Sequence, residues 1–506
     1  MEKSKYEKIM DIATKRGFVF PSSEIYGARA GFWTYGHLGT RIKQRWENLW
    51  RKTFLTLDQN FFEISDCTIM PKKVFESSGH LKNFNDPLTE CEKRHFRYRA
   101  DQLVEEELKI DVTGLKEDAL TRLMKDNKLK CQNCRGSLSD VRFFNMMFDL
   151  RVGVTGDEIM YLRPESAQSP YLAYKREIEA LRKKLPLGLA VIGSAFRNEI
   201  SPRQGFFRLR EFIQAELQIF FDPGQINEHE EFESVQGYRL KVFSEKKVRE
   251  ISAKEMNEKL KFPKFYVYHL VKVQEFYLSV LKVPESKFRF RELGAEERAF
   301  YNKIHFDIEL DLETLGGWKE AGGVHYRSDH DLLGHQTGSG EKLEFVSDDG
   351  KRRFIPHVLE LSFGVDRNVW ALLDIFFKEE KERTLFEFPS VVAPVDVAVF
   401  PLVNKEKIPE LAEHLFKELY KNFNVFYDES GSIGKRYRRQ DEVGTKYCIT
   451  LDFDSLKDNS VTLRERDSMK QIRVKAAELN IVLDGLMNEG KVLKDFGKFI
   501  EAEPEK

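Results

Sequence analysis

The sequence predicts an α+β fold, in which an antiparallel sheet flanked by helices precedes a small mixed α/β domain. Two apolar runs between Phe196 and Glu216, joined by a Ser-Pro-Arg-Gln-Gly turn, indicate a charged antiparallel hairpin. Far downstream, Pro356 to Phe363 is strand-like, and Gly364 begins a turn into a helix running through Trp370 and Phe377. After Glu387 strand and helix patterns alternate, which favours the α/β domain.

Composition narrows the class of protein. The 506 residues correspond to roughly two to four domains, and 41% hydrophobic residues are ample for buried cores. The net charge is −1, so any nucleic-acid binding must come from local basic patches. No apolar run is long enough to span a bilayer, and the start MEKSKYEKIM lacks the apolar core of a secretory signal. We therefore expect a cytoplasmic protein.

The first half of the chain predicts several elements in order. Helical spacing of apolar residues predicts a long helix over Leu38 to Leu55, followed by an edge strand ending near Pro71. Pro164 is expected to open a helix over Glu165 to Lys184, and Leu187 to Phe196 is expected to form a buried strand.

Later segments carry their own patterns. The run VYHLVKVQEFYLSVLKV is helix-like, Asp307 to Glu313 alternates as a strand does, and GGWKEAGGVHYRSDHDL suggests a glycine-flanked acidic turn. In the last part, FPSVVAPVDVAVFPLV predicts a buried strand. It is followed by a helix near Lys405 to Phe423, the strand NVFYD, the basic helix GSIGKRYRRQDEVGTKY, and the strands CITLDF and SVTLRERD. This alternation predicts a small mixed α/β domain with a parallel core.

The charges of the predicted hairpin indicate a polyphosphate ligand. It carries four arginines, each a planar fork of donors that suits phosphate oxygens, and three glutamates: Arg197, Arg203, Arg208, Arg210, Glu199, Glu211 and Glu216. A nucleoside triphosphate is the natural candidate. The glycines form neither GxGxxG nor GxxxxGK[ST], so neither a dinucleotide-binding site nor a P-loop is supported.

These segments together resemble the signature motifs of class II aminoacyl-tRNA synthetases. The second and third motifs of that family are resembled by FRNE with the charged loop and REF, and by the distant GVDR. The first motif, which forms the dimer interface in that family, is resembled by the helix and strand from Gly39 to Pro71. More narrowly, the chain resembles glycyl-tRNA synthetases of the dimeric archaeal and eukaryotic type. This likeness runs almost end to end, through YRAD, LRPESAQ, FRNEISPR, KEAGGVHYRSDHDL and ELSFGVDR.

The resemblance implies a domain arrangement. Residues 1–85, 141–221 and 288–385 would form the catalytic core, 86–140 an inserted subdomain containing CQNC, and 222–287 a second insertion. Residues 390–506 would form an anticodon-binding domain. The implied partners are ATP, glycine, tRNA(Gly) and a second copy of the chain, with Mg²⁺ accompanying ATP.

Site residues for ATP follow from the resemblance. Arg197 would bind the α-phosphate, Arg208 or Arg210 the outer phosphates, and Arg367 the γ-phosphate; Arg197 and Arg367 are the catalytic pair. Phe212 and Arg367 would enclose the adenine, and Glu199 would face the adenine or the tRNA end. Glu320 and Glu360 are the implied Mg²⁺ carboxylates. The surrounding motif residues complete the implied ATP site: Asn198, Phe207, Leu209, Glu211, Ala321, Gly364, Val365 and Asp366.

Glycine must be recognised by its ammonium and carboxylate, because it has no side chain. The family grips the ammonium with acidic residues, whose positions match Glu165 and Glu216, and Ser362 would help close the pocket. Arg99 and Arg327 are candidates for the carboxylate. Neighbouring motif residues complete the implied glycine site: Phe212, Ile213, Gln214, Ala215, Glu360, Leu361, Phe363 and Gly364.

The basic run KRYRR is by default a solvated helix face. Within an anticodon-binding domain its residues become candidates for contact with tRNA, with the same ambiguity for Arg464 and Arg466; the run comprises Lys435, Arg436, Tyr437, Arg438 and Arg439.

The five cysteines do not form a disulfide framework, because their spacing is sparse and the chain is long. A structural zinc site needs four ligands, which Cys91, His95, Cys131 and Cys134 could supply. A degenerate site, or a reduced CxxC pair without metal, is the alternative.

Two other functions stay open from the sequence. The same fold could activate threonine, proline or serine, which amino-acid-dependent exchange of pyrophosphate into ATP would distinguish. A non-catalytic paralogue could bind RNA or a protein through the same scaffold, although Arg197, Arg367 and the acidic residues are all present.

Overall fold

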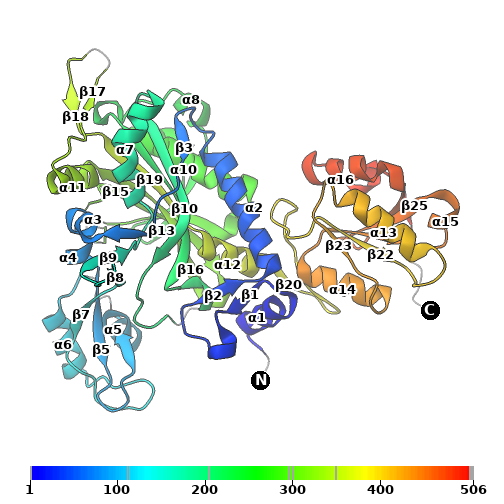
Figure 1. Ribbon diagram of the computed structural model, residues 1–506, viewed down its shortest axis with the longest axis horizontal. Coiled ribbons are helices and arrows are strands. Elements are labelled where there is room, and N and C mark those ends of the chain that lie inside the picture. The colour runs from blue at the N-terminus through cyan, green and yellow to red at the C-terminus, as the bar shows by residue number, and fades with distance from the viewer. Residues whose placement is uncertain are drawn as a thin grey trace.

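The structure is a computed structural model that describes residues 3–110, 112, 114–202, 205–294, 297–298, 301–347 and 350–500. Figure 1 shows a large body built around one sheet and a smaller C-terminal domain, orange to red, beside the N-terminal helix. Arg203 of the predicted hairpin lies outside the described residues.

A nine-stranded sheet organises the large body. Its order is β13-β12-β14-β15-β16-β19-β11-β10-β3. All neighbours pair antiparallel except β3 with β10 and β12 with β14, which confirms the predicted antiparallel core. The strands are β3 (Phe61–Glu63), β10 (Leu187–Phe196), β11 (Glu211–Phe221), β12 (Arg239–Ser244), β13 (Lys247–Ser252), β14 (Phe288–Glu292), β15 (Ile304–Leu312), β16 (Gly317–Ser328) and β19 (His357–Gly364).

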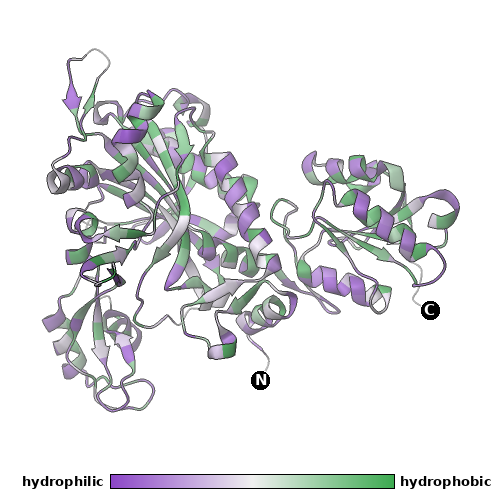
Figure 2. Ribbon diagram, viewed as in Figure 1, coloured by the Kyte–Doolittle hydropathy of each residue, from purple (hydrophilic) through white to green (hydrophobic). Residues whose placement is uncertain are grey.

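Three helices cover one face of this sheet: α2 (His37–Phe54), α10 (Lys264–Glu275) and α12 (Val365–Phe376). Most of the predicted apolar stripe of α2 is buried, and only Leu49 is partly exposed. Trp46 and Trp50 each pack edge-on against Phe363 of β19. Figure 2 shows the hydrophobic colouring concentrated on the central strands and the hydrophilic colouring on the outer helix faces. This packing fixes the ends of β11 and β19, where functional side chains emerge.

The opposite face is covered only in part. Helices α7 (Gln168–Leu181) and α11 (His330–Ser339) bury Tyr174 and Leu332 against Phe220 and Val358 near one end of the sheet. Helix α7 begins at Gln168 and not at Glu165 as predicted, because residues 163–167 form a turn that directs Glu165 into the site. The rest of this face is available for ligands.

The predicted hairpin exists, but its connection is longer than expected. Strands β10 and β11 pair from Leu187↔Phe220 to Phe196↔Glu211. The connection between them, called the 197–210 loop, is described at residues 197–202 and 205–210. Arg197, Arg208 and Arg210 therefore lie on this loop and not on half-buried strands, so their charges do not have to be buried within the sheet.

Two further expectations are corrected. The glycine-rich segment around Glu320 is a strand, β16, and not a turn: a bulge opposite Ile308/Glu309 accommodates its irregularity. The segment 222–287 is not separate from the core, because β12 and β13 extend the main sheet and α10 packs on it. This segment also holds the short helices α8 (Phe232–Val235) and α9 (Ala253–Glu258).

The inserted subdomain forms its own small core. Strands β6 (Arg97–Arg99), β5 (Asn85–Glu90) and β7 (Arg142–Asn145) make a three-stranded sheet. Helices α5 (Ala100–Leu108) and α6 (Glu117–Asp126) pack with Cys91 and Cys131 into one buried cluster. A second small sheet links it to the body, with strands β4 (Ile69–Pro71), β9 (Glu158–Leu162) and β8 (Asp149–Val152), beside the short helices α3 (Lys72–Ser77) and α4 (His80–Asn83).

Short elements complete the large body. They are α1 (Lys5–Arg16), β1 (Val19–Pro21), β2 (Trp33–Tyr35), β17 (Phe345–Val346), β18 (Arg353–Phe354), β20 (Phe377–Glu379) and β21 (Thr384–Phe386).

The C-terminal domain confirms the predicted mixed sheet. Its order is β23-β22-β24-β25-β26-β27, with β22 parallel to both β23 and β24. Ion pairs between Arg45 and Asp396, at 2.7 Å, and between Arg16 and Glu442, at 2.6 Å, attach it to the large body. Its elements are β22 (Val397–Pro401), α13 (Ile408–Leu419), β23 (Val425–Tyr427), α14 (Ile433–Val443), β24 (Tyr447–Leu451), α15 (Ser455–Asp458), β25 (Ser460–Glu465), β26 (Gln471–Lys475), α16 (Leu479–Asn488) and β27 (Phe499–Ile500).

Among the described residues, no helix combines the length and the apolar character needed to cross a membrane.

Candidate active site

One cavity, of about 150 Å³, brings the predicted motifs together on the open face of the sheet. Its walls come from the 197–210 loop, β11, β16, β19 and the start of α12. The predicted residues that line it are Glu165, Arg197, Glu199, Phe207, Arg208, Leu209, Phe212, Ile213, Gln214, Glu216, Glu320, Ala321, Arg327, Glu360, Ser362, Gly364, Asp366 and Arg367.

Glu216 occupies the deepest acidic position. Its side chain is buried, and its two oxygens accept hydrogen bonds from Ser166 Oγ at 2.7 Å and Ser362 Oγ at 2.8 Å. Among the described residues no lysine, arginine or histidine forms an ion pair with it. Burial, followed by repulsion from Glu360 and Glu165, raises the pKa of Glu216 to about 8. The site therefore holds a buried carboxyl group for which the described residues provide no ion-pair partner.

The neighbouring carboxylates, in contrast, are neutralised. Buried Arg327 contacts Glu360 at 2.9 Å, Asp331 at 2.9 Å and Glu165 at 3.5 Å. Burial alone would raise the pKa of Glu360, but Arg327 and His325 lower it to about 2. Burial likewise opposes ionisation of Glu165, but the charges of His80 and Arg327 bring its pKa well below the ordinary value. Arg327 thus orders an acidic cluster around Glu216.

Because side chains alternate along a strand, the residues predicted to bind glycine lie on two opposite faces of the sheet. Gln214 and Glu216 of β11 are register partners of Gly364 and Ser362 of β19, and all four line the cavity. The intervening side chains of Ala215, Leu361 and Phe363 point into the helix-covered core, so the predicted contact of these side chains with glycine is not formed. Val365, predicted for the ATP site, is buried in the same core at the start of α12. Ile213 instead donates its main-chain N–H to Asp366 over 2.6 Å, which fixes the strand to α12.

The arginines of the loop are held by different partners. Arg197 donates Nε to the Pro164 carbonyl at 3.0 Å, and its guanidinium lies 5.2 Å from the ring centroid of Phe212. Arg208 pairs with the Glu199 carboxylate at 2.8 Å inside the cavity wall. Arg210 is held by main-chain carbonyls, those of Glu199 and Ala30, and is not part of the cavity lining. Of the two alternatives for the outer phosphates, the geometry favours Arg208.

The far end of the cavity carries Arg367 and Glu320. Arg367 pairs with the Glu320 carboxylate at 3.1 Å, and its guanidinium lies 5.3 Å from the ring centroid of Phe207. In this structure Phe212 lies beside Arg197 and Arg367 lies beside Phe207. An adenine ring held between Phe212 and Arg367 therefore stays a prediction.

Besides Arg210 and the core-facing side chains, three more of the predicted ligand residues lie outside the cavity. Arg99 pairs with Asp86 at 3.1 Å and with Asp101 at 2.5 Å in the inserted subdomain, so the structure does not bring it to the glycine site. Asn198 donates its main-chain N–H to the Met146 carbonyl, and Glu211 is exposed at the start of β11.

Sequence reasoning missed several lining residues: Ser166, Tyr301, Gly322 and His325 line the cavity or cap its carboxylates. His325 pairs with Glu360, and the Tyr301 ring lies 4.2 Å from the Arg327 guanidinium. Ser166 lies in LRPESAQ and His325 in KEAGGVHYRSDHDL, so their presence in quoted motifs was the available signal.

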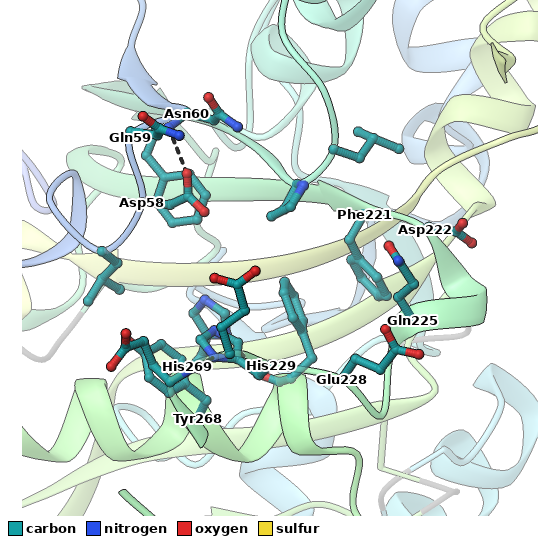
Figure 3. Close-up of a pocket in the computed structure, with 17 residues that line it drawn as sticks. Asp58, Gln59, Asn60, Phe221, Asp222, Gln225, Glu228, His229, Tyr268 and His269 are labelled. Atoms are coloured by element: carbon teal, nitrogen blue, oxygen red, sulfur yellow. Dashed lines mark hydrogen bonds between the residues drawn. The ribbon is translucent and has the colours of Figure 1, made fainter. Parts of the chain in front are cut away.

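A second cavity, of about 500 Å³, lies between the residues before β3, the end of β11 and the start of α10 (Figure 3). Figure 3 shows His229 and His269 close together, and the His229 ring stacks on Tyr268 with centroids 3.6 Å apart. Among the described residues that line this cavity there is no lysine or arginine, and five are carboxylates: Asp58, Asp222, Glu228, Glu230 and Glu231. Its charge excludes a triphosphate, so it is not the ATP site.

The predicted zinc ligands converge only in part. The Sγ atoms of Cys91, Cys131 and Cys134 lie within 4.8 Å of one another. His95 lies apart from them, because its Nδ1 pairs with Glu90 at 2.7 Å and its side chain is 75% exposed. The Cys₃His set suggested by the sequence is therefore not formed.

The predicted tRNA contacts also separate into two groups. Lys435 is exposed, and Arg438 and Arg439 are partly exposed. Arg436 is buried against the carbonyls of Gly431 and Pro401, so contact with tRNA is not available to it. The same holds for three more side chains, which pack or bond internally: Tyr437 to Thr450, Arg464 to Asp441, and Arg466 to Gly444 and Phe388.

Comparison with known proteins places this geometry in a family. The family model "tRNA synthetase class II core domain (G, H, P, S and T)" matches residues 151–376, and "Anticodon binding domain" matches residues 396–484. A solved prolyl-tRNA synthetase from Cryptosporidium parvum, crystallised with L-proline and AMP, is 14% identical. It has a TM-score of 0.59 and covers 96% of this chain and 76% of its own, so it supports the fold.

Curated relatives are closer in sequence. The glycine–tRNA ligase of Thermococcus kodakarensis is 38% identical and that of Thermococcus gammatolerans 37%, each covering 94% of this chain and 97% of the relative. That of Methanococcus vannielii is 35% identical over 93% of this chain. The chain therefore belongs to the glycine–tRNA ligase family of class II aminoacyl-tRNA synthetases.

Proposed function

We propose that this chain joins glycine to tRNA(Gly) in two steps in the cavity around Glu216. The glycine carboxylate attacks the α-phosphorus of ATP, forming glycyl-adenylate and releasing pyrophosphate. The glycyl group then passes to a hydroxyl of the terminal adenosine of tRNA, releasing AMP. The observation that carries this proposal is the buried Glu216 carboxyl, which two serine hydroxyls hold and which forms no ion pair with any described residue.

Glycine supplies the missing cation. Its ammonium group, placed at Glu216, would favour the ionised carboxylate, because its attraction for the carboxylate offsets the repulsion from Glu360 and Glu165. The two serines fix both carboxylate oxygens, so the ammonium is received at a defined position. The glycine carboxylate would then lie toward Arg197 on the 197–210 loop.

Arg197 is suited to the reacting phosphate. Its Nε is held by Pro164 O, and among the described residues it has no carboxylate partner within ion-pair distance. A guanidinium positioned in advance stabilises negative charge as it develops on the α-phosphate, without reorganisation during the reaction. Arg208 and Arg367 each carry a carboxylate partner that phosphate oxygens would displace.

Selection against larger amino acids follows from packing. The pocket floor is formed by buried Glu216, whose two oxygens already accept hydrogen bonds from the hydroxyls of Ser166 and Ser362. A substrate methyl group forced into such a filled polar site costs on the order of 1–3 kcal/mol. Threonine, proline and serine are larger still than alanine or place a hydroxyl there.

The residues present fit Mg²⁺ with ATP unequally. Glu320 has a half-exposed side chain and one arginine partner, so its oxygens are accessible to an ion carried by the phosphates. Both oxygens of Glu360 already accept hydrogen bonds from His325, Arg327 and Gln218. We assign Glu320 as the first carboxylate for the ion, which would neutralise phosphate charge, and Glu360 as a residue that positions Arg327 and His325.

The wider setting is proposed on the same basis. The C-terminal domain would bind the anticodon end of tRNA, through exposed Lys435 and Arg438 on α14. Strand β3 is the edge of the main sheet and lies next to α2, the segment that the family uses for dimerisation, so we propose a homodimer. We place the reaction in the cytoplasm, where the substrates of protein synthesis occur.

The test is amino-acid-dependent exchange of pyrophosphate into ATP by the purified chain. We expect strong exchange with glycine and little with alanine, serine, threonine or proline. Arg197→Ala should abolish the glycine-dependent signal while leaving the fold intact by circular dichroism. Exchange that responds equally to alanine or proline would refute the glycine assignment, and no exchange with any amino acid would refute catalysis.

A further inference from the structure

The inserted subdomain contains a tight turn at its first cysteine. In residues 91–96, the N–H of His95 donates to the carbonyl of Cys91 over 2.8 Å, and the N–H of Cys91 donates to the carbonyl of Phe96 over 2.8 Å. His95 adopts a left-handed conformation, with φ of 57°. These features define the turn 91–96 as a closed loop that presents its first side chain inward.

A second turn has the same backbone conformation. In residues 131–136, the N–H of Arg135 donates to Cys131 O over 2.8 Å, and the N–H of Cys131 donates to Gly136 O over 3.0 Å. Arg135 has φ of 58°. The two turns therefore correspond residue by residue, and the position of Cys134 in the second is taken by Arg94 in the first.

Three thiols from these turns meet at one point. Cys91 Sγ and Cys134 Sγ are 3.4 Å apart, and all three Sγ atoms lie within 4.8 Å. Cys91 and Cys131 are completely buried. Asn133 Nδ2 donates to the Tyr98 hydroxyl at 2.8 Å, and Tyr98 in turn contacts Cys131 Sγ at 3.1 Å. This is a built donor set for a soft metal ion, since thiolates are its preferred ligands.

Neither Arg94 nor His95 supplies the fourth ligand of a tetrahedral site. Arg94 is exposed, and a guanidinium that stays protonated cannot ligate a metal. His95 is turned outward to Glu90. A site with four protein ligands is closed, whereas one with three keeps an open position.

We propose that the turns 91–96 and 131–136 form a three-thiolate site for a zinc-class ion, whose fourth position is open to an exogenous ligand because Arg94 stands in the place of a fourth cysteine. The ion would displace three thiol protons, and a water molecule, imidazole or small thiol would complete the coordination. This proposal is independent of the ligase reaction.

The test uses Co²⁺ as a spectroscopic probe on the reduced, full-length chain. We expect one Co²⁺ per chain with thiolate-to-cobalt charge-transfer absorption, lost in Cys131→Ser. Adding imidazole or 2-mercaptoethanol should shift the ligand-field bands of the wild type, because these molecules enter the open position. Arg94→Cys should give a four-thiolate spectrum that imidazole no longer shifts, with a Co²⁺ Kd lower by at least about tenfold.

Two matched variants make the test decisive. Arg94→Ser removes the same guanidinium without adding a thiol, so its spectrum and its response to imidazole should equal those of the wild type. His95→Ala should also leave both unchanged. A wild-type spectrum that imidazole does not shift, a changed spectrum in His95→Ala, or no thiolate–cobalt absorption in the wild type would each overturn the proposal.

Discussion

Glu216 of β11 and Ser362 of β19 face each other across an antiparallel ladder, and the Ser362 hydroxyl donates to the Glu216 carboxylate over 2.8 Å. Ser166 donates to the other oxygen over 2.7 Å. Neutral donors satisfy the geometry of the carboxylate but not its charge. Burial and repulsion from Glu360 and Glu165 raise the pKa of this carboxyl group, and none of the described residues forms an ion pair with it, so this position favours an incoming ammonium group.

Replacing Glu216 by glutamine should weaken the binding of glycine but not that of ATP. The variant keeps the shape of the side chain: its amide oxygen can accept from one serine hydroxyl and its NH₂ group can donate to the other. It loses the charge that receives the ammonium. We expect kcat/KM for glycine in pyrophosphate exchange to fall about 10- to 150-fold, the range for a hydrogen bond to a charged group. The KM for ATP should change little.

The matched control is Glu250→Gln on β13, which removes an exposed carboxylate far along the sheet from the cavity. It should leave the kinetics of glycine and ATP unchanged. If Glu216→Gln raised the KM for ATP as much as that for glycine, the carboxylate would not be specific to the ammonium.

The same buried carboxyl group should make stability depend on pH. Burial raises the pKa of this carboxyl group in the folded state to about 8 from its ordinary value of 4.5, so between these values the folded state keeps a proton that the unfolded state has lost. The free energy of unfolding therefore decreases through Glu216 as pH rises from about 4.5 to about 8. Glu216→Gln removes this loss, so its Tm without glycine should exceed the wild-type Tm at pH 8.5.

At pH 5 the wild-type carboxyl group is protonated and resembles glutamine, so the two Tm values should converge. A Tm difference that is the same at pH 5 and pH 8.5, measured by differential scanning fluorimetry in matched buffers, would show that Glu216 does not titrate in this range.

Substitutions of two arginines in the 197–210 loop should have different effects, one on ATP binding and the other on the stability of the fold. Arg208 pairs with the Glu199 carboxylate in the cavity wall, whereas Arg210 donates to two main-chain carbonyls outside it. Arg208→Ala should raise the KM for ATP by roughly tenfold or more, with little change in Tm. Arg210→Ala should lower the free energy of unfolding by about 1–3 kcal/mol, because it leaves the carbonyl of buried Glu199 without its donors. The opposite assignment of the two effects would favour Arg210 as the phosphate ligand.

Substitutions of basic residues in the C-terminal domain should likewise fall into two groups, one that weakens tRNA binding and one that lowers Tm. Lys435→Ala and Arg438→Ala remove accessible charges from α14, so each should reduce the slope of log Kd for tRNA against log salt concentration by about 1. Arg464→Ala should instead lower Tm, because it leaves buried Asp441 with one ion-pair partner fewer. Filter binding at several salt concentrations, with thermal unfolding of the same proteins, distinguishes the two.

The elements that sequence could predict are those with strong local patterns. The apolar spacing of α2, the continuous apolar run of β10, and the change from strand to helix at Gly364 are each read from neighbouring residues, and each is confirmed. The segment around Glu320 was mispredicted, because four glycines resemble a turn while the flanking strands β15 and β19 decide that it pairs as β16.

The site residues that sequence reasoning misplaced depend on tertiary partners. Arg464 looks like a candidate for phosphate contact until buried Asp441 is brought next to it, and Arg99 looks available until Asp86 and Asp101 pair with it. Arginines that bind ligands and arginines that hold a fold together have the same local sequence, so only the packed structure separates them.

Proton release on glycine binding tests the central claim most directly. The wild-type chain, saturated with a non-hydrolysable ATP analogue at pH 7, can be titrated with glycine by calorimetry in buffers of different ionisation enthalpy. Because Glu216 has a pKa of about 8, binding of the ammonium should release close to one proton per glycine, and Glu216→Gln should release none. A binding enthalpy for the wild type that does not depend on the buffer would contradict the assignment of Glu216 as the ammonium receptor.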